Sequence, residues 1–316
     1  MGTVASPHFV IFPFMSHGHT IPLLHLATLL CRRFIAVTVF TTPANAPFIR
    51  DFLQDVSISI IELPFPKGVL GIPSGVENTE KLPSMSSFGQ FANATKLMQA
   101  LSVLQHRPTC VISDAFLGWT QESAEKIDIT RYCFFGMSVF ANTLCQIIRI
   151  ERPHSKTISP DEPSAVSSFP WLKLTRNDCP PPFGDLELKG PAVDFMKEQG
   201  FEDRVKNKAL IVKEWVDQMP ILALPFMAEQ HINARMVTEE IGVGLRIMPR
   251  NGSVRGFVEA EEVEKMVREL MEGERGERVR KKVKEMGENA EKSMKGGGSS
   301  WTTLGLLIDD ACAGYH

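Results

Sequence analysis

A histidine stands between a short apolar run and a periodic apolar segment near the start of the chain. Residues 8–14 (HFVIFPF) have the length of a buried strand, and residues 22–30 carry apolar side chains at helical spacing, so residues 15–21 are predicted to form the turn between them. Ligands of open α/β sheets bind beside such turns, and Gly18 lets the backbone turn tightly next to His19. An imidazole at this position can act as a general base.

A carboxylate follows another predicted strand. Asp114 comes directly after residues 109–113 (TCVIS), so we expect it at the same edge of the sheet as His19, where it can fix the tautomer of the imidazole and favour the imidazolium form. Two alternatives remain open: His19 can be a solvated loop residue, and Asp114 can be the N-cap of the helix expected from Trp119. His17 and His19 also suggest a metal pair, but no carboxylate or cysteine cluster lies nearby in the sequence, so no metal is expected.

Strand-like and helical segments alternate over the first half of the chain. Residues 35–42 and 57–63 are further strand candidates, followed by 109–113 and 130–135, with helical patterns between most of them. This alternation predicts an α/β fold with a doubly wound parallel sheet over residues 1 to about 150. Residues 151–190 are rich in proline and are expected to form a long irregular segment around one short helix.

The last third of the chain contains one arrangement that does not suit a parallel sheet. Strands are predicted at residues 209–215, 221–226 and 244–247, and helices at 229–241, 258–272, 275–292 and 301–311. Only residues 216–220 separate the first two strands, whereas parallel neighbours need a crossover of a dozen or more residues. Either these strands form a hairpin, or one is outside the parallel sheet, or chain is missing at this point.

Composition and charge exclude several classes of protein. The chain has 316 residues, a net charge of −3 and an ordinary share of hydrophobic residues, 43%. There is no basic region suited to nucleic acid, and no apolar run reaches the roughly 18 to 20 residues of a membrane span, so no stable membrane insertion is expected. Six cysteines without C-x-x-C spacing favour reduced thiols in a cytoplasmic protein. The oligomeric state stays open.

Two other enzyme classes fit the sequence poorly. The stretch around Ser138 (GMSVF) lacks the closing glycine of the G-x-S-x-G turn of α/β hydrolases, so Ser138 is expected to cap a helix. No G-x-G-x-x-G follows the first strand, which disfavours an enzyme that binds a dinucleotide.

Three separated motifs resemble the plant family-1 UDP-glycosyltransferases. They are PHFVIFPFMSHGHTIPLLHLA, CVISDAFLGWTQESAEKIDI, and EWVDQ with PILALPFMAEQHINARMVTEEIGVGLRI, in the order of that family and over nearly the whole chain. The resemblance implies a GT-B fold of two Rossmann-like domains, a UDP-sugar as donor substrate, no cofactor or metal, and a small lipophilic acceptor. It also implies that His19 deprotonates the acceptor hydroxyl and that Asp114 is its partner.

The resemblance further assigns binding residues. Trp215 matches the tryptophan that stacks on uracil, Gln218 a glutamine that contacts the nucleotide, and Glu229 and Gln230 the pair that holds sugar hydroxyls, with Gln230 favouring glucose. On the acceptor side, Phe14, Phe88 and Phe116 are expected to supply apolar walls.

The sequence departs from the family in its second half. Between Gln218 and Met219 the family carries a helix-bearing segment with a His-Cys-Gly-Trp-Asn-Ser motif that binds the diphosphate, and this sequence has no such motif. A second gap is expected near residues 198–201. We therefore expect an acceptor-binding domain over residues 1–198, a truncated nucleotide-sugar domain over 199–298, and a C-terminal helix over 299–316 that packs back on the first domain.

These features lead to two hypotheses about function. The first is an inverting O-glycosyltransferase that uses a UDP-sugar, with UDP-glucose as the expected donor, and whose activity the missing diphosphate segment can impair. The alternative is a catalytically inactive, truncated relative that acts as a small-molecule-binding or interaction module. Binding of UDP and UDP-glucose discriminates between them.

Overall fold

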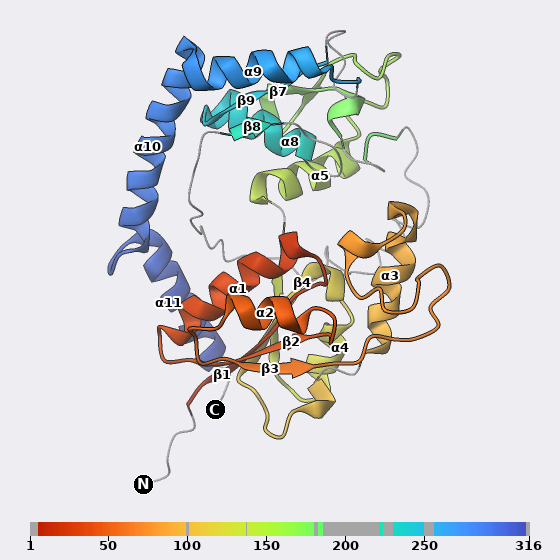
Figure 1. The fold of residues 1–316 in the computed structure, drawn as a ribbon, viewed down its shortest axis with the longest axis vertical. Helices are drawn as coiled ribbons and strands as arrows, with labels where there is room; N and C mark the ends of the chain where they lie inside the picture. Colours follow the sequence, from red (N-terminus) through yellow and green to blue (C-terminus); the bar gives the residue numbers. More distant parts are fainter. Residues whose placement is uncertain are drawn as a thin grey trace. The chain divides into compact units, whose positions relative to one another are not determined.

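The computed structural model describes residues 6–98, 101–136, 138–179, 183–185, 221–223, 230–249 and 256–313 (Figure 1). Contacts between Cα atoms divide the chain into two compact units, which are described separately below. The first contains the described residues up to 136 and from 306 onward, and the second contains those between them.

The first unit is built on a five-stranded sheet in which every neighbouring pair of strands is parallel. The strand order is β3-β2-β1-β4-β5, so the chain changes direction across the sheet between β1 and β4. The strands are β1 His8–Phe12, β2 Ala36–Thr41, β3 Ser59–Glu62, β4 Cys110–Asp114 and β5 Thr130–Phe134. The predicted α/β fold with a doubly wound sheet is confirmed, and its switch point lies between β1 and β4.

Helices connect these strands in alternation along the chain (Figure 1). They are α1 His17–Cys31, α2 Ala46–Phe52, α3 Phe88–Ala94 and α4 Thr120–Glu125, with short 3-10 turns that include Ala115–Leu117. The end of α11 (Ser299–Ala313) also belongs to this unit, because the Tyr132 hydroxyl on β5 donates a hydrogen bond to Asp310 Oδ2. Burial and the Asp310 carboxylate raise the pKa of Tyr132, which keeps this phenol a donor at neutral pH.

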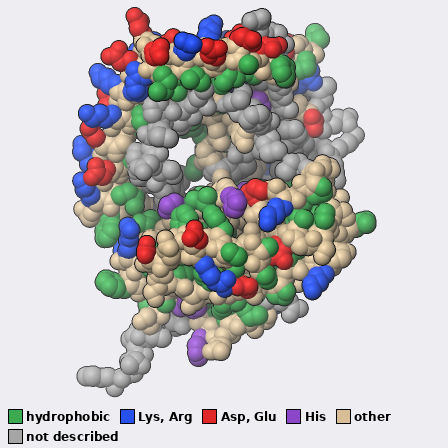
Figure 2. Space-filling model, in the orientation of Figure 1, with side chains coloured by type: hydrophobic (Ala, Val, Ile, Leu, Met, Phe, Trp, Pro, Cys, Tyr) green, Lys and Arg blue, Asp and Glu red, His purple; other side chains and the backbone are tan. Residues whose placement is uncertain are grey.

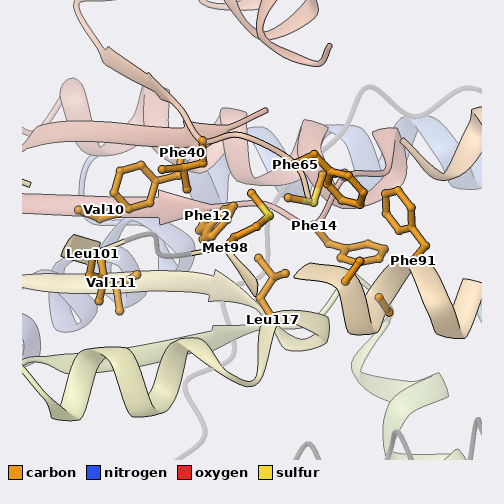
Figure 3. Packing of buried hydrophobic residues seen from close by; sticks show 14 of the residues in the cluster. Val10, Phe12, Phe14, Phe40, Phe65, Phe91, Met98, Leu101, Val111 and Leu117 are labelled. Carbon is orange, nitrogen blue, oxygen red and sulfur yellow. The ribbon is translucent and has the colours of Figure 1, made fainter. Parts of the chain in front are cut away.

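The core of the first unit is rich in phenylalanine (Figure 3). Phe12 and Phe40 pack edge to face on neighbouring strands, and Phe65 stacks on Phe91 of α3. Fully burying one such side chain contributes about 1.5–3 kcal/mol to the free energy of folding. The core continues to Phe14, just past the end of β1, so it directly supports the segment that leads to His19.

Helix α1 begins earlier than predicted. It begins at His17 rather than at Pro22, so His19 lies in its first turn and not in a loop. The reason is a contact with a residue far away in the sequence: the Glu80 carboxylate accepts hydrogen bonds from the backbone N–H of His17 at 2.8 Å and the hydroxyl of Ser16 at 3.2 Å. A carboxylate at a helix N-terminus satisfies an otherwise unpaired donor and suits the helix dipole.

The second unit contains short strands and longer helices. Its helices are α5 Val139–Glu151, α8 Gln230–Arg235, which continues as a π-helix over Met236–Ile241, α9 Ala260–Glu272 and α10 Glu274–Met294. Strands β8 Ile221–Ala223 and β9 Gly244–Arg246 pair in parallel. Both α9 and α10 carry many charged side chains on their outer surfaces (Figure 2), as the sequence predicts, while Leu270, Val279 and Val283 face the small core beneath. The strand predicted at residues 209–215 lies outside the described residues.

The proline-rich segment contains more order than predicted. Strands β6 Ser164–Val166 and β7 Phe169–Leu174 form an antiparallel hairpin where an irregular segment was expected. The hairpin closes over a short turn at Ser167 and Ser168, whose hydroxyls donate hydrogen bonds to the Glu151 carboxylate at the end of α5. These contacts involve a residue of the preceding helix, so the local sequence pattern does not predict the hairpin.

Candidate functional site

His19 and Asp114 meet at the switch point of the parallel sheet. His19 lies in the first turn of α1, directly after β1, and Asp114 is the last residue of β4. Their side chains are joined by a hydrogen bond of 2.7 Å between His19 Nδ1 and Asp114 Oδ2. The Asp114 side chain is fully buried, whereas the His19 side chain is 21% exposed. A buried anion therefore lies behind an imidazole that solvent or a ligand can reach.

Asp114 also caps a turn, although not the helix expected from Trp119, because α4 begins at Thr120 and its N-cap is Trp119. Its other oxygen, Oδ1, accepts a hydrogen bond of 2.9 Å from the backbone N–H of Phe116, at the start of the 3-10 turn Ala115–Leu117. Both carboxylate oxygens thus have a donor. Burying a carboxylate is costly unless it is hydrogen-bonded, and both oxygens of Asp114 meet this requirement.

An arginine on the neighbouring strand fixes the end of β4. Arg131 on β5 donates from Nη2 to the backbone carbonyl of Asp114 at 3.1 Å, and from Nε to the hydroxyls of Ser113 and Thr120, each at 2.8 Å. These bonds hold the backbone that carries the carboxylate. Sequence reasoning did not identify Arg131, because nothing in the local pattern of β5 marks one strand residue as special.

The hydrogen bond determines what the imidazole can do. Because the Asp114 carboxylate only accepts hydrogen bonds, the ring proton resides on His19 Nδ1, and the basic lone pair is on Nε2. An imidazole oriented in this way can take a proton from a hydroxyl within hydrogen-bond reach, and the carboxylate then stabilises the imidazolium. The arrangement can therefore perform general base catalysis.

Aromatic side chains surround the imidazole. The ring centroids of Phe116 and Phe14 lie 5.0 Å and 5.7 Å from that of His19. Phe14 also contacts Phe116 at 5.2 Å and Phe88 of α3 at 5.8 Å. The three phenylalanines that the sequence pointed to thus form one cluster with His19. Phe14 is fully buried, while Phe88 and Phe116 are partly exposed.

Most of the residues expected to bind the donor lie outside the described part of the chain. This is the case for Trp215, Gln218 and Glu229, whereas Gln230 is the exposed first residue of α8. The geometry of the expected donor site is therefore described only at Gln230.

Further expectations concern Ser138, metal ions and membrane-spanning helices. Ser138 is the N-cap of α5, as predicted, since its Oγ accepts a hydrogen bond of 3.0 Å from the Ala141 N–H. Within the described ranges, no group of three or more His, Cys, Asp or Glu side chains could hold a metal ion. None of the helices in that part of the chain is both long and apolar enough to cross a membrane.

Comparisons with known proteins agree on one group of enzymes, although no family model matches the chain. The chain is 32% identical to UDP-glycosyltransferase 90A1 and 31% identical to UDP-glycosyltransferase 90A2, both from Arabidopsis thaliana, with 96% of the chain covered in each case. The alignments cover 96% and 98% of these relatives. The alignment with UDP-glycosyltransferase 90A1 spans 462 residues, more than the 316 of this chain, so this relative has residues without a counterpart here.

A solved structure shows the same fold. The structure of Phytolacca americana UGT2, complexed with UDP-2fluoro-glucose and pterostilbene, superposes with a TM-score of 0.68 at 17% sequence identity. The superposition covers 97% of this chain and 100% of that one.

Proposed function

The chain belongs to the plant UDP-glycosyltransferases, and from this membership we propose that it transfers a sugar from a UDP-sugar to a hydroxyl group of a small lipophilic acceptor, with inversion at the anomeric carbon. The hydrogen bond of 2.7 Å between His19 and Asp114 carries the proposal, because this pair supplies the base that the reaction requires. Such a transfer uses the donor sugar as a substrate and needs no cofactor.

The proposed step is a direct displacement. His19 Nε2 takes the proton of the acceptor hydroxyl while the hydroxyl oxygen forms a bond to the anomeric carbon. The bond between that carbon and the phosphate oxygen of UDP breaks, and its electron pair leaves with UDP. Asp114 stabilises the imidazolium that forms and holds the ring in the productive tautomer. General base catalysis of this kind contributes roughly 10² to 10⁴ in rate.

The acceptor is proposed to lie against the aromatic cluster of Phe14, Phe88 and Phe116. Partly exposed rings beside the base favour an apolar or aromatic acceptor whose hydroxyl points at the imidazole. The related Phytolacca structure contains pterostilbene, which supports this class of acceptor.

For the donor, we propose the roles that the family resemblance gives to four residues. Trp215 stacks on uracil, Gln218 contacts the nucleotide, and Glu229 and Gln230 hold sugar hydroxyls. Glucose is the proposed sugar, and the UDP-2fluoro-glucose of the Phytolacca structure supports it. We also propose a domain division at residues 198 and 298, which differs from the division into compact units at residues 136 and 306.

A second candidate function follows from the missing diphosphate motif. The chain has no His-Cys-Gly-Trp-Asn-Ser segment, and its match to a relative runs over more residues than the chain contains. Each hydrogen-bond donor that is lost from the groups stabilising a transition-state oxyanion lowers the rate by roughly 10² to 10³. We therefore propose that transfer is slow, and the second candidate is an inactive relative that binds small molecules through the aromatic cluster.

The experiment uses the purified full chain with UDP-glucose and a panel of phenolic acceptors. Mass spectrometry detects the glycoside, and a coupled assay measures UDP release. We expect product from the unmodified chain and a decrease of about 10² or more for His19→Ala. His17→Ala is the matched control, because His17 is an exposed histidine two residues away and should leave the rate unchanged.

Calorimetry distinguishes the two candidate functions. Binding of UDP together with product formation supports the transferase. If the chain binds a phenolic ligand but binds no UDP and forms no product, the result supports the inactive relative and contradicts the transferase.

A further inference from the structure

A glycine beyond β5 lies against the imidazole of His19. Gly136 follows β5 by two residues and therefore reaches the same edge of the sheet as His19 and Asp114. A Cβ atom built on Gly136 would lie 2.7 Å from His19 Nδ1, 3.0 Å from Cε1 and 3.1 Å from Cγ. Real Cβ atoms essentially never approach another heavy atom within 3.0 Å. The backbone of Gly136 thus lies so close to the imidazole that a side chain at position 136 would collide with the ring.

Backbone conformation does not explain the glycine. Gly136 is outside the left-handed region, unlike Gly68, Gly71 and Gly75, which have positive φ angles. Its φ angle lies outside the region that favours glycine, so the close approach to His19 is the feature that requires a residue without a side chain.

The imidazole has little freedom to move away from position 136. Its Nδ1 is bonded to Asp114, and the Phe116 and Phe14 rings contact it. Asp114 cannot follow a displaced ring, because the backbone N–H of Phe116 and the guanidinium of Arg131 hold the carboxylate and the end of its strand. A methyl group at position 136 must therefore lengthen or misalign the bond between Nδ1 and Oδ2.

We infer that Gly136 is a positioning residue, which sets the plane of the His19 ring and keeps it in register with Asp114. This inference rests on the proposed function for its catalytic consequence, whereas its structural consequence is independent of any activity. Misplacing a reacting group by about 1 Å can lower a rate by roughly 10². A side chain at position 136 should thus act on kcat, with KM nearly unchanged.

A stability cycle tests the inference without requiring activity. Gly136→Ala should lower Tm by about 2–8 °C through overpacking against the ring. In the His19→Ala background, where the ring is absent, the same substitution should leave Tm nearly unchanged. Gly89→Ala is the matched control, because a Cβ at Gly89 on α3 meets no atom within 4 Å. An equal decrease in Tm with and without the His19 ring would overturn the inference.

Proton NMR adds a readout of orientation. The Nδ1 proton of a histidine bonded to a buried carboxylate gives a downfield signal, which His19→Ala identifies by its loss. We expect this signal to shift or disappear in Gly136→Ala and to persist in Gly89→Ala. If Gly136→Ala fails to fold while the double variant with His19→Ala folds, the collision is supported; an unchanged signal in Gly136→Ala contradicts it.

Catalytic rates separate this inference from the proposed function. With activity present, Gly136→Ala should lower kcat about 10²-fold with less than about a threefold change in KM. An inactive chain that nevertheless shows the Tm cycle and the NMR change would refute the transferase and leave the positioning role of Gly136 in place.

Discussion

In the part of the chain that the structure describes, two aspartates are almost completely buried, and they have very different partners. Asp114 in the first unit has no exposed surface and is bonded to the imidazole of His19 at 2.7 Å. Asp178 in the second unit is 1% exposed, and its Oδ2 lies 3.3 Å from a guanidinium nitrogen of Arg235, while its Oδ1 lies 3.8 Å from Arg246. The residue type and the burial are the same, but the counterions differ.

The partner decides what each carboxylate can do. An imidazole gains and loses a proton near neutral pH, so its bond to Asp114 can take part in proton transfer. A guanidinium stays protonated, so the contacts between Asp178 and its arginines only hold structure in place. Asp178 also forms a capping box with Thr175, and Arg235 extends the link to the backbone of β7. Buried charge alone therefore does not mark a functional site.

Asp114→Asn should have the largest effect on the rate, because it takes away the role in proton transfer that distinguishes Asp114 from Asp178. The amide keeps the cap on the Phe116 N–H, but its NH₂ donates to His19 Nδ1 and places the ring proton on Nε2. We expect kcat to decrease by roughly 10² to 10⁴. The control is Asp128→Asn, an exposed aspartate in the same unit. Equal rates for the two variants would show that Asp114 has only a capping role.

Asp178→Ala should affect stability instead of chemistry. It leaves Arg235 and Arg246 without their buried counterion, which costs about 3–5 kcal/mol in the free energy of unfolding. Urea unfolding measures this loss, and the downfield proton of the pair His19 and Asp114 should remain in the folded protein. Adding Arg235→Met should recover part of the stability. No recovery would mean that an unpaired Arg235 is not the main cost of removing Asp178.

Ser138→Ala compares an uncharged cap with the charged cap at Asp114. Loss of the bond to the Ala141 N–H should lower the free energy of unfolding by about 1 kcal/mol. Ser138→Asp restores an acceptor for the Ala141 N–H but cannot donate to Asn233 Oδ1 as the hydroxyl does, so it should recover part of this loss. Thermal unfolding gives the values, and glycoside formation per folded molecule should stay constant. A complete loss of product in Ser138→Ala with normal stability would make Ser138 a catalytic candidate again.

His154 provides the smallest effect and a contrast with His19. Burial lowers the pKa of His154 from its ordinary value of 6.5, and the charges of Arg152 and Arg176 act in the same direction against Asp185. The unfolded chain therefore binds this proton more readily than the folded chain. Keeping His154 neutral therefore costs no stability above pH 6.5, and the free energy of unfolding decreases as the pH falls from 6.5 toward the lowered pKa. Because one proton is involved, the loss is at most about 1.4 kcal/mol for each pH unit.

The measurement for His154 is unfolding free energy between about pH 7.5 and about pH 5. His154→Gln should lose less stability on acidification than the unmodified chain. His25→Gln, which replaces an exposed histidine of α1, is the control and should follow the unmodified curve. Parallel curves for His154→Gln and the unmodified chain would exclude protonation of His154 as a cause of acid destabilisation.

Prediction from sequence succeeded where the signal is local and periodic. The apolar runs of β1, β2 and β4 predicted buried parallel strands, and from these the edge shared by His19 and Asp114 followed. Prediction was wrong where distant residues decide the outcome. The start of α1 at His17 depends on Glu80, and the hairpin of β6 and β7 depends on Glu151.

The site shows the same division. His19, Phe14 and Phe116 could be named from their positions next to strand ends, whereas Phe88 lies in α3 and was named as part of the expected acceptor site. Arg131 and Gly136 could not be named, because their importance comes from the atoms they approach and not from a pattern around them.

The sequence by itself determined a parallel α/β sheet, a histidine and an aspartate at its carboxyl edge, and membership of a recognisable family. Only the tertiary structure decided that their side chains meet at 2.7 Å, that the carboxylate caps a turn at the same time, and that a glycine from a third strand end lies against the ring. The physical reason is one of range: periodicity and turn propensity act over a few neighbouring residues, whereas hydrogen bonds and close packing depend on how distant segments register across the sheet.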